Sequence, residues 1–225
     1  MSSEAFTVKQ TEADNSHDAG PVRTAHMIAS VLLDYPSEDF MNHLDIITTE
    51  LDSVDPEVAQ SFERFIEWAR NTPQDEIETA YVETFDQKRK CNLYLSYYST
   101  GDTRLRGTAI LTFQQAFEAV GWKVTAGELP DYLPAVLELS ARTGDELATH
   151  LVNIHREGLE VLRAALTSLS SPWQHVVDAL ILTLPPLDKR AEDAFKRLVM
   201  QGPPAEMVGV QELPFPTTNS QETRR

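Results

Sequence analysis

Apolar residues recur every three or four positions along most of the chain, which is the spacing of one face of an α-helix. Pro36, Pro56 and Pro73 interrupt this pattern in the first half of the chain, where one helix ends or the next begins. Proline lacks an N–H and has a fixed φ, so it suits the first turn of a helix but not its interior. The pattern predicts four helices in this half, over residues 27–32, 40–51, 56–69 and 73–85.

The helical spacing continues in the second half of the chain. Residues 91–101 are aromatic with a shorter-range pattern, and we expect a helix end and a connecting loop there. No long run of alternating β-branched residues competes with the helical pattern. The fold class is therefore expected to be all-α, a single globular domain of about nine helices. The helices expected in this half cover residues 103–120, 128–141, 145–169 and 173–181, with a last one after Pro185 and Pro186.

The two ends of the chain differ from the middle in composition. The first residues are polar and rich in Ser and Asp, and four prolines follow residue 202 among polar neighbours. Such segments do not contain enough apolar residues to form a core. We expect a disordered tail over 1–22, the helical domain over 23–200 and a Pro-rich disordered tail over 201–225.

The net charge of the chain limits the classes of molecule that it is expected to bind. The chain has 19 Lys and Arg against 35 Asp and Glu, a formal net charge of −16. This negative field repels phosphate backbones and anionic lipid surfaces, so nucleic-acid binding is disfavoured. The chain also has no apolar run near the length of about 20 residues that a bilayer span requires, so we expect no membrane insertion. Cys91 is the single cysteine, and no signal-peptide core is present, which favours a cytoplasmic protein.

Motifs for catalysis and cofactor binding are absent from the sequence. It contains no phosphate-binding glycine loop, no hydrolase elbow and no Glu-x-x-His pair for a di-iron site. Asp39 with His43, and Glu146 with His150, are spaced for ordinary ion pairs on a helix. Cys91 lies among apolar neighbours and is expected to be a small buried group. We therefore predict no catalytic residues, no metal ligands and no cofactor.

Two short clusters remain open to interpretation. Lys88, Arg89 and Lys90 form a basic run that is too short for a nucleic-acid surface, and we favour a solvated helix end. The tyrosines that follow it, at positions 94, 97 and 98, suit a recognition surface, because their hydroxyl groups can bind a partner. Packing in the core explains them equally well.

Four segments match a known family in order and spacing. They closely resemble the nitrate reductase delta-subunit chaperones, which belong to the wider class of TorD-like redox-enzyme maturation chaperones, and the resemblance covers about residues 24–200. In the wider class the Pro-Asp pair is often followed by His, whereas this chain has Tyr132, so no role of that histidine carries over. The four segments are 81–86 (YVETFD), 91–98 (CNLYLSYY), 101–107 (GDTRLRG) and 128–134 (ELPDYLP).

The resemblance implies a non-catalytic, all-helical assembly chaperone for a membrane-bound respiratory nitrate reductase. Members of the family bind the N-terminal segment of the catalytic alpha subunit, alone or in its complex with the beta subunit. They hold the apoenzyme competent for insertion of the molybdenum cofactor and delay membrane attachment until then. The candidate partner-binding residues in the matching segments are Tyr81, Phe85, Asp86, Tyr94, Tyr97, Tyr98, Arg104, Arg106, Glu128 and Asp131.

Two alternatives from other classes stay open. A permanent structural subunit that bridges a cytoplasmic enzyme to its membrane anchor would also be acidic, helical and free of catalytic motifs. The ratio of this chain to the mature enzyme distinguishes that subunit from a chaperone. A helical enzyme with an unrecognised site is the other alternative.

Overall fold

The computed structural model describes residues 19–101, 103–124 and 127–184. These residues form helices in one compact arrangement and contain no strand, which confirms the all-α prediction. The helices are α1 (Ala19–Leu33), α2 (Phe40–Glu50), α3 (Pro56–Arg70), α4 (Gln74–Tyr81), α5 (Leu95–Thr100), α6 (Leu105–Ala119), α7 (Leu133–Thr143), α8 (Glu146–Asn153), α9 (Arg156–Ser168) and α10 (Trp173–Leu182). None of them is long and apolar enough to cross a bilayer.

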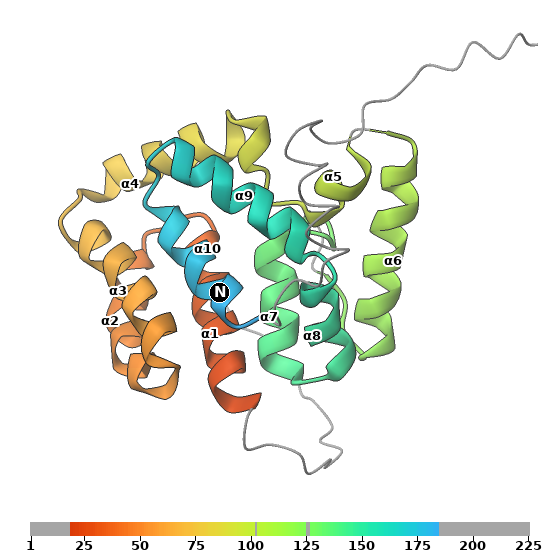
Figure 1. Cartoon of the computed structure of the whole chain (residues 1–225), viewed down its shortest axis with the longest axis horizontal. Coiled ribbons are helices and arrows are strands. Elements are labelled where there is room, and N and C mark those ends of the chain that lie inside the picture. Colours follow the sequence, from red (N-terminus) through yellow and green to blue (C-terminus); the bar gives the residue numbers. More distant parts are fainter. Residues whose placement is uncertain (1–18, 102, 125–126, 185–225) are drawn as a thin grey trace, which may run out of the picture.

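Helix α1 lies in the middle of the molecule. It packs against α7 and α10, and α10 in turn packs against α3 and α9 (Figure 1). Helices α2 and α3 form one end of the arrangement, and α5 and α6 form the other (Figure 1). The segments of the chain that resemble the family are spread over the end of α4, α5, the start of α6 and the start of α7.

Trp173 is at the centre of the core. Its side chain is 1% exposed, and its indole N–H donates a 3.0 Å hydrogen bond to the carbonyl of Leu32. This bond ties the first turn of α10 to the end of α1. Four aromatic rings from α3, from α4 and from the turn after α4 lie within 5.2–5.7 Å of the Trp173 ring: Phe65, Trp68, Tyr81 and Phe85.

Residues 91–101 are not simply a loop, so this prediction is wrong. They contain the 3₁₀ turn Arg89–Cys91 at their start and then the short helix α5. Helix α5 is stabilised from a distance, because the backbone N–H of Ser96 donates to the Asp131 carboxylate and the N–H of Leu95 donates to the Asp131 carbonyl. A contact between residues 35 positions apart cannot be detected in the local pattern of apolar and polar residues.

The helix predicted over 128–141 begins later, at Leu133. The preceding residues pair with the segment before α5, through an isolated antiparallel bridge between Tyr94 and Tyr132. The N–H of Leu133 donates to the carbonyl of Leu93 at 2.8 Å. Pro130 also disfavours helical geometry in the residue before it. The prediction was therefore wrong for the first turn only.

The predicted helices over 73–85 and 145–169 are each interrupted. Helix α4 ends at Tyr81 and continues as the π-helical turn Val82–Asp86. Helices α8 and α9 are separated by Ile154 and His155, and the His155 ring donates from Nδ1 to the Leu151 carbonyl at 2.8 Å. The new direction brings Gly158 against Tyr98, where an added Cβ would lie 2.9 Å from the Tyr98 Cβ. The predicted helix after Pro186 lies outside the described residues.

His26 is a buried polar link between α1, α7 and α10. Its ring nitrogens lie 2.9 Å from Ser140 Oγ and 3.1 Å from Thr183 Oγ1. Since the Thr183 hydroxyl donates to the Leu180 carbonyl, it accepts from His26 Nε2–H, which leaves Nδ1 to accept from Ser140. Burial lowers the pKa of His26 from 6.5 to about 4, so the ring is neutral in the folded protein at neutral pH.

We expect acid to destabilise the fold through His26. The unfolded chain binds a proton near pH 6.5 and the folded chain only near pH 4, so stability is complete above pH 6.5 and falls as the pH drops toward 4. The full loss is about 3 kcal/mol. Urea unfolding at pH 7.5 and pH 4.5 measures it. The variant His26→Gln should show a shallower dependence on pH than the wild type, and an unchanged slope would contradict this role.

Candidate functional site

Three parts of the chain meet on one face of the molecule: the residues after α1, the turn after α4 and the segment before α5. We call this surface the tyrosine face. Helix α1 ends at Leu33, and the chain then turns at Pro36, which places two polar residues at its tip. The π-helical turn and the two segments joined by the Tyr94–Tyr132 bridge lie beside that tip. The tyrosine face consists of Asp34, Tyr35, Glu78, Tyr81, Asp86, Tyr94, Arg106, Glu128 and Tyr132.

A chain of hydroxyl groups connects α1 to the bridge. Tyr81 Oη donates to the Leu33 carbonyl at 3.0 Å, and Tyr132 Oη donates to Asp34 Oδ1 at 3.1 Å. The two hydroxyl oxygens lie 3.2 Å apart. Two hydroxyl protons therefore serve three contacts, so one of the three contacts lacks a proton at any time. Burial, the largest cause, raises the pKa of both tyrosines well above the usual value, which keeps them protonated.

Tyr94 organises the other side of the face. Its ring centre lies 5.4 Å from that of Tyr132, and its hydroxyl donates to Glu128 Oε1 at 2.9 Å. The Arg106 guanidinium lies over the ring, 5.6 Å from its centre. Burial, followed by the hydrogen bond to Glu128, raises the pKa of Tyr94 to about 12. Glu128 and Arg106 are thus both held in place by one half-buried aromatic ring.

Carboxylates dominate the charge of the tyrosine face. Asp34 and Asp86 are exposed, and Tyr35 Oη lies 3.5 Å from Glu78. The field of Asp34 and Asp86 contributes to the raised pKa of Tyr81, which places both carboxylates close to it. A surface of carboxylates and tyrosine oxygens offers hydrogen-bond acceptors and attracts cationic donors such as Lys, Arg or an amino terminus.

Asp131 lies inside the protein and not on this surface. Its side chain is fully buried, and Oδ2 accepts from the backbone N–H and the hydroxyl of Ser96. Asp131 Oδ1 has no hydrogen-bond partner among the described residues. The carboxylate caps α5 and so fixes the segment that carries Tyr94.

The ten predicted partner-binding residues therefore fall into three groups. The structure brings Tyr81, Asp86, Tyr94, Arg106 and Glu128 together on the tyrosine face. Arg104 is exposed at the start of α6. Tyr81 is itself buried, and the other predicted residues that are packed inside are Phe85, Tyr97, Tyr98 and Asp131. Whether any of the ten binds a partner stays a prediction.

Four residues of the tyrosine face were missed by the sequence analysis: Asp34, Tyr35, Glu78 and Tyr132. Asp34 and Tyr35 precede Pro36 and lie outside the segments that carry the resemblance. The signal that could have identified Asp34 and Tyr35 is a carboxylate next to a tyrosine at the end of a helix. Tyr132 was noted only as a departure from the family pattern, although its hydroxyl contacts both Tyr81 and Asp34.

The described residues show no arrangement for metal binding, since no three His, Cys, Asp or Glu side chains among them are grouped to hold an ion. Cys91 is fully buried, as the sequence predicted. Burial raises the pKa of its thiol to about 11, which removes the thiolate needed for nucleophilic attack.

The family model of the nitrate reductase delta subunit matches residues 51–178, which include Tyr81, Tyr94 and Tyr132 of the tyrosine face. The chain belongs to the nitrate reductase delta subunit family. The structure is also similar to the crystal structure of a redox enzyme maturation protein from Archaeoglobus fulgidus, with a TM-score of 0.56 and 19% sequence identity. The similarity covers 76% of this chain and 98% of that chain. This confirms the predicted resemblance and fold.

Relatives in the delta subunit family include proteins of different lengths. The nitrate reductase-like protein NarX of Mycobacterium tuberculosis is 34% identical over 77% of this chain, which spans only 26% of that relative. The nitrate reductase molybdenum cofactor assembly chaperone NarJ of Bacillus subtilis is 28% identical over 69% of this chain and 85% of its own length. The chaperone NarJ of Escherichia coli K12 is 26% identical over 69% of this chain and 67% of its own length.

Proposed function

We propose that this chain is an assembly chaperone for a respiratory nitrate reductase. It binds the N-terminal segment of the catalytic alpha subunit and holds the apoenzyme competent for molybdenum cofactor insertion before the enzyme attaches to the membrane. The names of the Bacillus and Escherichia relatives support the chaperone role. The resemblance in sequence supports the choice of the alpha subunit as client.

The tyrosine face is the observation that carries this proposal. Its acceptors are positioned before any client arrives, because Tyr132 holds Asp34 and Tyr94 holds Glu128. A client segment with Lys, Arg or a free amino terminus can donate to these carboxylates without first ordering them, which reduces the entropic cost of binding. The aromatic rings beside them supply apolar contact area.

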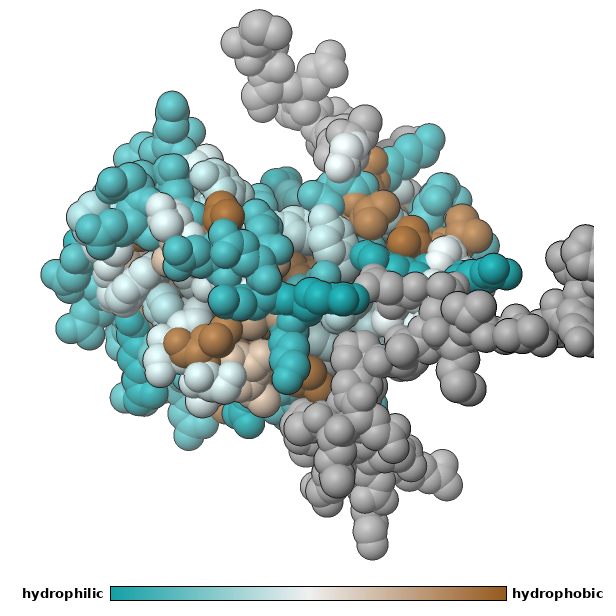
Figure 2. Space-filling model, turned by 90° about the horizontal axis from the view of Figure 1, so that it is seen from above, coloured by the Kyte–Doolittle hydropathy of each residue, from teal (hydrophilic) through white to brown (hydrophobic). Residues whose placement is uncertain are grey.

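The acidic field of the whole chain supports the same client chemistry. Seen from above, hydrophilic residues cover most of the surface, and hydrophobic ones are confined to a few separate areas (Figure 2). A net charge of −16 draws a basic segment toward this surface and raises the association rate at low ionic strength. Recognition by charge and hydrogen bonds also permits release once the client has folded.

Molybdenum content of the reductase tests the proposal. In a strain without this chain, the alpha polypeptide should be present while its molybdenum content and its activity fall to a small fraction of the wild-type values. Normal molybdenum content in that strain would overturn the chaperone role. Mature reductase purified from the wild type should contain this chain far below a one-to-one ratio, since an equimolar ratio would assign it as a permanent subunit.

A further inference from the structure

The described part of the chain ends at a fixed point beside the start of α9. Arg156, the first residue of α9, donates from Nη1 to the carbonyl of Ile181 at 3.3 Å and to that of Leu184 at 2.9 Å. Leu184 is the last described residue, and its side chain is buried. We call its position the exit point. A contact with α9 therefore sets the place from which residues 185–225 continue.

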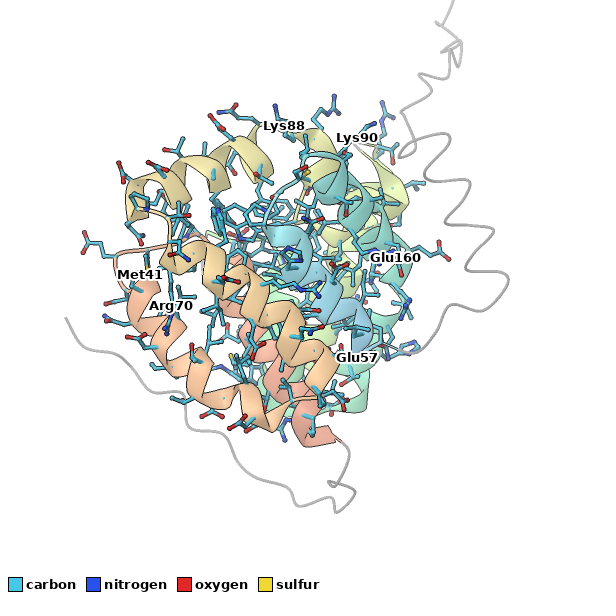
Figure 3. The ribbon with its side chains drawn as sticks, turned by 60° about the vertical axis from the view of Figure 1, so that its left-hand side comes forward. Met41, Glu57, Arg70, Lys88, Lys90 and Glu160 are labelled. Atoms are coloured by element: carbon cyan, nitrogen blue, oxygen red, sulfur yellow. The ribbon has the colours of Figure 1, made fainter. Side chains whose placement is uncertain are left out.

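Glu160 holds Arg156 in this position. Its Oε1 lies 3.3 Å from Arg156 Nη2, and both side chains are largely buried. Figure 3 shows Glu160 well separated from Met41 of α2 and from Arg70 at the end of α3. The exit point is therefore anchored to α9, away from the part of the molecule that Met41 and Arg70 mark.

Exposed aliphatic side chains lie close to the exit point in the chain. Leu182, two residues before Leu184, is 48% exposed, and Ile154, two residues before Arg156, is 55% exposed. Ile154 keeps the helical φ and ψ of α8, so Leu147, two turns earlier, shares its face and is 41% exposed. Aliphatic groups gathered on neighbouring elements mark a contact surface more often than single exposed ones do. We call Leu147, Ile154 and Leu182 the exit surface.

Helix α8 is apolar beyond the side that packs into the core. Its buried residues are Ala148, Leu151 and Val152, and the exposed Leu147 and Ile154 extend the apolar side onto the surface. A surface helix normally carries polar residues outside the stripe that faces the core. No described element covers this additional apolar side, so it favours contact with a segment that the described residues do not include.

The sequence after the exit point contains a segment with one apolar side. Its seven charged residues, at positions 188–190, 192, 193, 196 and 197, occupy the other sides of a helix. An isolated helix shorter than about 12–15 residues is marginal in water, so this segment needs a surface to cover its apolar side. The apolar residues, which recur at helical spacing, are Leu187, Ala191, Ala194, Phe195 and Leu198.

The connection to this segment is very short. Pro185 and Pro186 alone separate Leu184 from Leu187, and proline suits the first turn of a helix. An extended chain spans at most about 3.6 Å per residue, so Leu187 lies within about 11 Å of Leu184. A short tether gives the attached segment an effective concentration of about 1 mM or more at a nearby surface. A second copy of the chain at micromolar concentration competes poorly with it.

We propose that residues 187–198 form an amphipathic α-helix that docks on the exit surface, antiparallel to α8. The docked helix starts near the end of α8, so Ala191 faces Ile154. Leu198 then faces Leu147, because seven residues separate the two positions on each helix and every residue adds about 1.5 Å. This goes beyond the proposed function, since it involves no residue of the tyrosine face and needs no client.

An engineered disulfide tests the position of the helix in the full chain. Leu147→Cys with Leu198→Cys places two thiols across the proposed contact, and oxidation should give an intrachain disulfide. The matched control is Leu169→Cys with Leu198→Cys, because Leu169 is a leucine 46% exposed at the opposite end of α9. The first pair should give at least about tenfold more intrachain disulfide than the second, measured by mass spectrometry at micromolar protein. The native Cys91 is buried and does not compete.

Hydrogen exchange tests whether the segment is helical because it is docked. In the wild type, amides of residues 191–198 should exchange at least about tenfold more slowly than those of an unstructured chain. Phe195→Asp places a charge on the apolar side and should remove this protection. Met200→Asp introduces the same side chain on the charged side and should leave the protection unchanged.

Four results would overturn the proposal. They are equal disulfide yields in the two cysteine pairs, disulfide-linked dimers in place of the intrachain product, absence of protection in the wild type, and protection that survives Phe195→Asp. Dimers would assign the exit surface to a second copy of the chain. Protection that appears only after the alpha-subunit segment is added would assign the surface to the client. None of these results bears on the molybdenum content that tests the proposed function.

Discussion

Replacing Trp173 with alanine is expected to lower the free energy of unfolding by about 3–5 kcal/mol. The indole ring is 1% exposed and contacts four aromatic rings, so its removal leaves a cavity that the surrounding helices cannot fill without moving. The change also leaves the carbonyl of Leu32 without the indole donor. Urea denaturation followed by circular dichroism measures the loss.

Trp122→Ala is the matched control for this variant. Trp122 is half-buried after the end of α6, and its ring faces Arg142, with the guanidinium 6.0 Å from the ring centre. Its removal creates less internal cavity and should cost under about 2 kcal/mol. A loss for Trp173→Ala no larger than for Trp122→Ala would show that the aromatic cluster does not hold α1, α3 and α10 together.

Removing the charges of the tyrosine face is expected to weaken binding of the alpha-subunit N-terminal segment by about a hundredfold. The triple variant Asp34→Asn, Asp86→Asn, Glu128→Gln replaces each carboxylate with an amide of the same shape. The amide oxygens can still accept from Tyr132 and Tyr94, so the fold and the tyrosines should keep their positions. Only the charge-assisted bonds to a basic client are lost.

Calorimetry and stopped-flow mixing with the alpha-subunit segment test this result. The control is the triple variant Glu57→Gln, Glu63→Gln, Glu67→Gln, which removes the same charge from exposed positions of α3. It should slow association slightly and keep the dissociation rate of the wild type. If both triple variants lose affinity equally, net charge alone attracts the client and the tyrosine face has no special role.

Much of the fold follows from local sequence patterns. Asp55 and Pro56 begin α3 where a cap and a first-turn proline predict it, and the apolar positions of that helix are the buried ones. Helix α5 could not be predicted in the same way, because its N-terminal donors are satisfied by Asp131, which is distant in sequence. Gly158 of α9 likewise packs closely against Tyr98, a contact between residues 60 positions apart that the local pattern does not show.

The candidate site is predicted less completely than the fold. Resemblance points to Tyr81, Tyr94 and Glu128, which the structure places on one face. It does not separate them from Tyr97 and Tyr98, whose rings are buried. This segment changes from an isolated bridge to a short helix, so no regular spacing tells which of its tyrosines faces solvent.

The tyrosine face can assemble only late in the synthesis of the chain. Its parts come from the end of α1, the turn after α4 and both sides of the Tyr94–Tyr132 bridge, so they are separated by almost a hundred residues, as the Asp34–Tyr132 bond shows. During synthesis, Asp34 emerges from the ribosome long before Tyr132 and has no fixed orientation until the later segment arrives. Under the proposed function, client capture therefore waits until the chain has completed its own folding, and a truncated chain that stops before residue 132 has no assembled face to compete for the client.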